Sequence, residues 1–259
     1  LSREGARVLM ERILAAAPDF FSANNLAFLA QSAGLTLGMT FVGCGMGFGL
    51  AFLLVFLRQT PGPWALPLRL LCVLYVEVFR RIPFLVVIYL VLFFIQAISP
   101  DASLFAIAVI AIGLYAVAYT ADIIRGGLES VPPAQVEAAR CMNLSRWQTT
   151  TRIVLPQAWP VILPPAIAFA VSFIKDTALV SQIGVFELTF RARELNNEGY
   201  PALLVYGTVA FIYFLLSFPL SLLGQHLEKR LATPRGHRRA RALRRAGGPQ
   251  GREPVHRQG

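Results

Sequence analysis

Long apolar stretches without charge constrain the fold of this chain more than any other feature. The clearest, 34–57, contains no charged residue and is long enough to cross a bilayer, which takes roughly 20 apolar residues. Four further apolar stretches lie at about 70–97, 102–121, 161–185 and 201–223, of which the first and third are interrupted by charged residues. Only 15% of the residues are charged, against about 25% in soluble domains. The sequence therefore predicts an all-α, polytopic membrane protein with about five transmembrane helices, because lipid leaves unpaired backbone groups unsatisfied.

The distribution of Lys and Arg predicts how these spans are oriented, since cytoplasmic connections carry the excess of basic residues. The connection at 125–160 is basic, and from Gly224 onward ten Lys or Arg stand against two Glu, a net charge of +8 out of the chain's +10. The N-terminal segment and the connection at 182–200 are close to neutral. We therefore expect the N-terminus outside and the C-terminus inside.

Three regions follow from this arrangement: an extracytoplasmic or interfacial segment at 1–33, a transmembrane domain at 34–231, and a basic tail at 232–259. The tail is rich in Arg, Gly and Pro, a composition typical of disorder. Its charge fits contact with anionic lipid better than contact with nucleic acid.

Small residues recur at four-residue spacing in the first span, in the pairs Gly34 and Gly38, Gly43 and Gly47, and Gly45 and Gly49. Such pairs let another helix approach closely in lipid, although Gly is common in membrane helices in any case. The three cysteines, at 44, 72 and 141, have no spacing typical of a metal site or a disulfide framework. We expect no bound metal.

The sequence of the polar connection between the third and fourth spans predicts two short helices. Pro132 and Pro133 suit a helix start, and 145–148 is a Ser-x-x-Gln capping box that predicts a second helix, ending by Pro156. Asn143 stands at the turn between them. Such a hairpin could dock in a groove of another protein or lie on the lipid surface, and the residues alone leave both interpretations open.

A family resemblance favours docking. The stretch 137–156 resembles the EAA motif of ATP-binding-cassette importer permeases, which reads Glu-Ala-Ala, three residues, Gly, nine residues, Ile-x-Leu-Pro. Here Glu137, Ala138 and Ala139 are followed at the same spacing by Asn143 in place of Gly, and then by Ile-x-Leu-Pro at 153–156. Because Asn tolerates left-handed backbone second only to Gly, we expect a positive φ at Asn143.

Further segments are similar to the polar amino-acid branch of that family, namely 75–83, 118–132 and 175–189, so the resemblance covers about 34–231. Arg81-Ile82 replaces the family's Gly-Thr, so a different translocation pathway or gate is expected at that point. The resemblance implies a transmembrane subunit in the bacterial inner membrane that forms the translocation pathway for an amino acid.

The resemblance also implies the partners: a second permease subunit, identical or related, an extracytoplasmic solute-binding protein, and a separate ABC ATPase that holds ATP and Mg²⁺. The chain has no Gly-x-x-x-x-Gly-Lys-Ser/Thr phosphate loop, so we expect neither enzymatic activity nor a cofactor of its own. The residues expected at the ATPase interface are Glu137, Ala138, Ala139, Asn143, Arg146 and Trp147.

Charged and polar residues within the spans form the second group of candidates, since intramembrane charges are costly and usually functional. They line a translocation pathway or form an ion network, with Asp176 expected to pair with Arg80 or Arg81. The stretch 166–174 holds no carboxylate, which favours a non-cationic substrate unless the other subunit supplies the charge. The candidates are Glu77, Arg80, Arg81, Ser172, Lys175, Asp176, Thr177 and Gln182.

The alternative function is that of a secondary transporter or channel with a cytoplasmic regulatory loop. Such a protein would be expected to carry an inverted repeat or more paired intramembrane charges. Neither is visible in the sequence.

Overall fold

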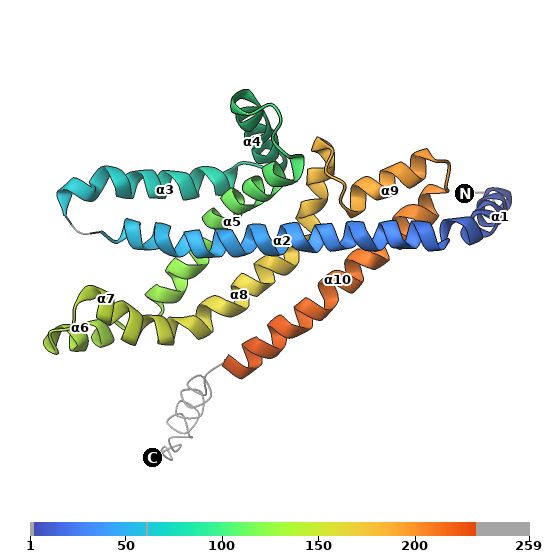
Figure 1. The fold of residues 1–259 in the computed structure, drawn as a ribbon. Coiled ribbons are helices and arrows are strands. Elements are labelled where there is room, and N and C mark those ends of the chain that lie inside the picture. Colours follow the sequence, from blue (N-terminus) through green and yellow to red (C-terminus); the bar gives the residue numbers. More distant parts are fainter. Residues whose placement is uncertain (1–2, 61, 232–259) are drawn as a thin grey trace, which may run out of the picture.

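The computed structural model describes residues 3–60 and 62–231, and every regular element in these ranges is helical. The predicted tail at 232–259 lies outside them. The elements, shown in Figure 1, are α1 Arg3–Phe20, α2 Ala23–Arg58, η1 Pro63–Ala65, α3 Leu66–Arg81, α4 Phe84–Ile98, α5 Leu104–Glu129, α6 Pro133–Cys141, α7 Arg146–Thr149, η2 Thr150–Val154, α8 Leu155–Asp176, η3 Thr177–Ile183, α9 Leu188–Asn197 and α10 Ala202–Leu231.

The predicted all-helical membrane architecture is confirmed. Within the described residues, four helical stretches are long and apolar enough to cross a membrane: Ala23–Arg58, Leu104–Glu129, Arg146–Ile183 and Ala202–Leu231. The first of them begins at Ala23, earlier than the predicted 34, because the polar residues before 34 continue the same helix.

The predicted second span is a broken one. The stretch Pro63–Arg81 and the helix Phe84–Ile98 meet at an angle of 117°. Pro83 stands at the break and caps α4, as expected for a residue that cannot donate a backbone hydrogen bond inside a helix. If the pair is taken as one span, the described part of the chain has five candidate spans.

The long helices α2 and α5 pack against each other through glycine. A Cβ placed at Gly43 would overlap Ile112, and one at Gly47 would lie 2.5 Å from the Cβ of Ala116. The close approach predicted for the pair Gly43 and Gly47 is therefore confirmed. The other four glycines of the predicted pairs have no atom near the position of an added Cβ.

Two ends of the molecule follow from this packing (Figure 1). The hairpin α6–α7 lies where α2 ends, and α1 and α9 lie at the opposite end beside the start of α2. A separate apolar cluster holds that opposite end together, with Phe20, Leu29, Leu188 and Leu195 fully or almost fully buried. The candidate sites occupy the first end and the middle of the bundle.

Candidate functional site

The turn between α6 and α7 has the geometry predicted from its sequence. Asn143 has φ 57° and is the only non-glycine residue with positive φ in the described chain. The turn is closed by backbone bonds: Asn143 N–H donates to the carbonyl of Arg140 over 2.9 Å, and Leu144 N–H donates to that of Ala139 over 3.1 Å. The prediction that Asn replaces Gly in left-handed backbone is thus confirmed.

The capping box at the start of α7 is also present. Ser145 Oγ accepts from the Gln148 N–H over 3.2 Å, and Gln148 Oε1 accepts from the Ser145 N–H over 2.9 Å. These two bonds satisfy backbone donors that the first helical turn leaves free. The start of α7 is thereby fixed three residues after the left-handed Asn143.

The predicted end of this second helix by Pro156 is wrong. A π-helical turn, η2, follows α7 and leads without a break into α8, so that helix runs from Arg146 to Ile183. The Leu155 N–H donates to the carbonyl of Thr150, five residues back. A π-turn is a known way to accommodate local disruption of the α-helical ladder, and here it precedes a proline without an N–H. The hairpin is therefore continuous with a membrane helix.

The three residues of the Glu-Ala-Ala trio differ in exposure. Glu137 and Ala138 are exposed on α6, whereas Ala139 is 0% exposed. α6 packs against η2, and a methyl side chain at Ala139 allows the two segments to approach. Glu137 and Ala138 thus lie on the surface of the hairpin, while Ala139 belongs to its interior.

Arg146 and Trp147 contact the end of α2. Arg146 Nη1 donates to the carbonyl of Gln59 over 3.5 Å, and the Trp147 ring lies 5.7 Å from that of Phe56, centroid to centroid. Trp147 is still 66% exposed. Both residues therefore join the hairpin to the membrane domain.

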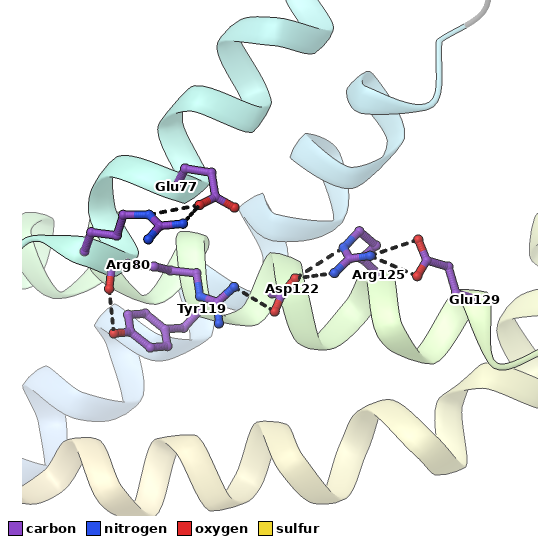
Figure 2. A network of polar contacts seen from close by, with 7 residues as sticks. Glu77, Arg80, Tyr119, Asp122, Arg125 and Glu129 are labelled. Atoms are coloured by element: carbon purple, nitrogen blue, oxygen red, sulfur yellow. Dashed lines mark hydrogen bonds and ion pairs between the residues drawn. The ribbon is translucent and has the colours of Figure 1, made fainter.

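A ladder of alternating charges links α3 to α5 (Figure 2). Arg80 Nη1 lies 2.8 Å from Asp122 Oδ2, and Arg125 Nη2 lies 2.8 Å from Asp122 Oδ1. Arg125 also binds Glu129 over 2.9 Å, and Arg81 binds Glu77 within α3 over 2.6 Å. Asp122 is thus shared by two guanidinium groups from different helices.

The expected pairing of Asp176 with Arg80 or Arg81 is wrong. Arg80 is paired with Asp122 because α3 packs along α5, and Arg81 is paired one turn back with Glu77. Within the described chain, Asp176 forms no ion pair.

Aromatic side chains flank the ladder toward α8. The Arg80 guanidinium lies 5.7 Å from the centre of the Tyr119 ring, within the range of a cation–π contact. The Tyr119 hydroxyl donates to the carbonyl of Arg80 over 3.4 Å and lies 3.0 Å from the Tyr115 hydroxyl. Tyr119 in turn stacks on Phe169 of α8. The charged ladder is therefore bounded by a wall with hydroxyl groups.

The candidates on α8 and η3 divide into exposed and buried ones. Thr177 is fully buried, and its hydroxyl donates to the Ile174 carbonyl over 2.6 Å, so it faces no open space. The remaining candidates on these elements are exposed: Ser172, Lys175, Asp176 and Gln182.

Two acidic residues with prominent roles were absent from the predicted candidates. One is Asp122, the centre of the ladder. The other is Glu187, which is 0% exposed and caps α9 by accepting from the Phe190 N–H over 2.7 Å. Burial raises the pKa of this carboxyl above its ordinary value. Its signal in the sequence is a lone carboxylate within the apolar run 183–188.

The described residues contain no group of three or more His, Cys, Asp or Glu side chains placed to hold a metal ion. The two candidate regions are therefore the hairpin, with Glu137 and Ala138 exposed on it, and the charge ladder between α3 and α5.

The hairpin and most of the membrane helices lie in a region that is similar to a known protein family. Residues 65–233 match the family described as binding-protein-dependent transport system inner membrane component. The chain is 36% identical over 197 residues to the L-cystine transport system permease protein TcyB of Bacillus subtilis (strain 168), with 76% of this chain and 83% of the relative covered. It is 31% identical over 208 residues to the glutamine transport system permease protein GlnP of Escherichia coli (strain K12), covering 80% and 94%.

Solved structures show the same fold. A chain in the crystal structure of an amino acid ABC transporter with histidines superposes with a TM-score of 0.74 at 27% identity, covering 84% of this chain and 98% of the other. A chain of the inward-facing MetNI methionine ABC transporter gives 0.70 at 22% identity, covering 82% and 99%.

Proposed function

The chain belongs to the family of inner membrane components of binding-protein-dependent transport systems, and on that premise we propose that it forms part of the translocation pathway for an amino acid. Membership makes it the permease subunit of an ABC importer, in which a separate ATPase hydrolyses ATP, and favours this function over a secondary transporter or channel. Relatives named for L-cystine and glutamine transport support an amino-acid substrate.

The observation that carries the coupling proposal is the geometry of the hairpin. Asn143 turns the chain back, and the turn leaves Glu137 and Ala138 exposed on α6. We place the contact with the ATPase there. Because α7 continues through η2 into α8, a movement imposed on the hairpin reaches a membrane helix without a flexible joint. Arg146 and Trp147 hold the hairpin against α2 and flank the contact.

The charge ladder is proposed to line the pathway or its gate. Arg80 and Asp122 retain partial exposure, and the exposed Lys175 and Asp176 lie at the end of α8. A zwitterionic amino acid carries one charge of each sign. A pathway wall with both acidic and basic side chains can form ion pairs with it without leaving an unpaired charge in lipid. The absence of a carboxylate at 166–174 supports a non-cationic substrate.

The proposed assembly contains a second permease subunit, the ATPase with its ATP and Mg²⁺, and an extracytoplasmic binding protein, in the inner membrane of a bacterium. Its transport activity is tested in proteoliposomes that hold the complete transporter and internal ATP. Labelled neutral amino acids are expected to enter only when the binding protein is present outside. Strong competition by arginine or lysine would contradict the proposed substrate preference.

The coupling contact is tested by Glu137→Lys, measured as co-purification with the ATPase and as ATP-driven uptake. Gln135→Lys is the matched control, because Gln135 is exposed on the same helix but points about 200° away around the axis. We expect Glu137→Lys to reduce both readouts and Gln135→Lys to preserve them. Unchanged assembly and uptake in Glu137→Lys would refute the contact.

The ladder is tested by a double-mutant cycle of Arg80→Gln and Asp122→Asn. If the two residues act as a pair, the double variant retains more uptake than the product of the single effects predicts, because it leaves no unpaired charge between them. Independent effects on uptake would show that the pair does not act as a unit in transport.

A further inference from the structure

A cavity of about 630 Å³ lies between the hairpin and the ends of two membrane helices. Its walls come from the end of α2, the end of α5, and α6, α7 and η2. The volume is within the roughly 300–1,000 Å³ of small-molecule sites. The cavity is separate from the exposed Glu137 and Ala138, which do not line it.

The position of the tryptophans indicates where this cavity lies relative to the membrane. Trp64 follows the end of α2, Trp147 packs on Phe56, and Trp159 stacks on Phe52. These are the three tryptophans of the chain, and all lie along the last turns of α2 or just beyond it. Trp is enriched at headgroup level in membrane proteins, which argues for a cavity at the height of the lipid headgroups.

The cavity carries free positive charge. Arg140 and Arg146 line it, and the carboxylate of Glu129, which also lines it, is already bound to Arg125 over 2.9 Å. In the described chain the Arg140 side chain forms no hydrogen bond or ion pair, and the contact of Arg146 with the Gln59 carbonyl is long, at 3.5 Å. Two guanidinium groups therefore have donors available for a phosphate.

Most of the other lining residues are apolar, and the remaining ones are uncharged polar residues: Gln59, Thr60, Thr149 and Thr150. Phe56 and Trp147 contribute aromatic surface, and Val136, Leu144 and Val154 contribute aliphatic surface. A small hydrophilic anion would leave this surface without a partner. A phospholipid supplies both parts, a phosphate for the arginines and a glycerol backbone with the first methylenes for the apolar wall.

We propose that this cavity binds the headgroup of an anionic phospholipid, held by Arg140 and Arg146. Basic pockets at the cytoplasmic side of membrane helices are suited to such headgroups. A lipid seated there contacts α2 and the hairpin at once, and so reinforces the contacts of Arg146 and Trp147 with α2. Anionic lipid then stabilises the position of the element that receives the motion of the ATPase.

The test is native mass spectrometry of the full chain in complex with its ATPase, delipidated and titrated with phosphatidylglycerol or, in parallel, with phosphatidylcholine. We expect phosphatidylglycerol to bind more tightly, and Arg140→Gln and Arg146→Gln each to weaken it about fivefold, as expected for one basic residue near an anionic headgroup. Arg152→Gln is the matched control, because Arg152 is exposed on the same connection but does not line the cavity. Its affinity for the lipid should equal that of the unmodified chain.

Four outcomes would overturn the proposal. Equal binding of the two lipids would remove the role of charge, and an equal loss in Arg152→Gln would make the effect one of general surface potential. Displacement of phosphatidylglycerol by millimolar inorganic phosphate would assign the cavity to a free anion. A complex with the ATPase that binds no lipid, although the permease alone does, would show that the ATPase fills the cavity. The assay measures binding without transport, so its result is independent of the substrate.

Discussion

The Tyr213 hydroxyl on α10 donates a 2.9 Å hydrogen bond to Oε2 of Glu187, a side chain with no exposed surface. The same hydroxyl lies 2.8 Å from Thr189 Oγ1, and the neighbouring Leu188 N–H donates to Thr36 Oγ1 on α2 over 3.2 Å. Residues from α2, α9 and α10 thus meet around one buried carboxyl group. This network fixes α9 to the membrane helices at the end of the molecule opposite the hairpin.

Removal of the phenolic hydroxyl should destabilise this end. Tyr213→Phe leaves a buried carboxyl oxygen without its donor, which costs about 1–3 kcal/mol. The midpoint of thermal unfolding in detergent, followed by tryptophan fluorescence, is therefore expected to fall. Tyr206→Phe on the exposed side of the same helix is the control and should leave the midpoint unchanged. Equal midpoints for both variants would show that the bond contributes nothing to stability.

The stability of the protein should also depend on pH through Glu187. Burial raises the pKa of this carboxyl in the folded protein, so the folded state favours the protonated form relative to the unfolded chain, whose carboxyl titrates near its ordinary value of about 4.3. The resulting stabilisation is complete below that ordinary value and is lost as the pH rises through the raised pKa.

Glu187→Gln isolates this contribution, because glutamine resembles the protonated carboxyl and does not titrate. As the pH rises above about 4.3, the unfolding midpoint of the unmodified chain should fall relative to that of Glu187→Gln. A difference that stays constant over the titration would contradict a raised pKa.

Neither Glu187 nor Asp122 was predicted as a site, and both for the same physical reason. Each lies close to an apolar stretch whose hydrophobicity identifies a span, but its partners come from helices distant in the sequence. Arg80 and Asp122, like Thr36 and Leu188, meet only after the helices have packed. Sequence patterns give the helices and their breaks, as at Pro83, but not which charge faces which.

The helix contact between α2 and α5 gives a prediction with a close internal control. Gly47→Ala would place a Cβ 2.5 Å from the Cβ of Ala116, an overlap that forces the helices apart and costs about 1–3 kcal/mol. Gly45→Ala, two residues away, meets no atom within 4 Å and removes the conformational freedom of glycine. We expect a lower unfolding midpoint for Gly47→Ala and an equal or higher one for Gly45→Ala. The reverse order would exclude a tight contact at Gly47.

The hairpin was more predictable, because its signals are local. A capping box needs only Ser145 and Gln148, and a left-handed turn needs only a residue that tolerates it. The prediction failed at Pro156, where the sequence marks a helix end but a π-turn carries the helix onward. The burial of Ala139 could not be predicted from the sequence either, because it depends on how α6 packs on η2.

The left-handed turn gives the last prediction. Asn143→Gly should preserve transport and assembly with the ATPase, because glycine adopts φ near 57° without strain. Asn143→Val should impair both, since a left-handed conformation costs an ordinary L-residue about 1–2 kcal/mol and a β-branched one is poorly tolerated there. ATP hydrolysis stimulated by the loaded binding protein is the measurement, with Asn143→Gly as the control. The valine variant is expected to lose this stimulation while the ATPase keeps its unstimulated rate. If Asn143→Val were coupled as well as Asn143→Gly, the turn geometry would have no role in transmission.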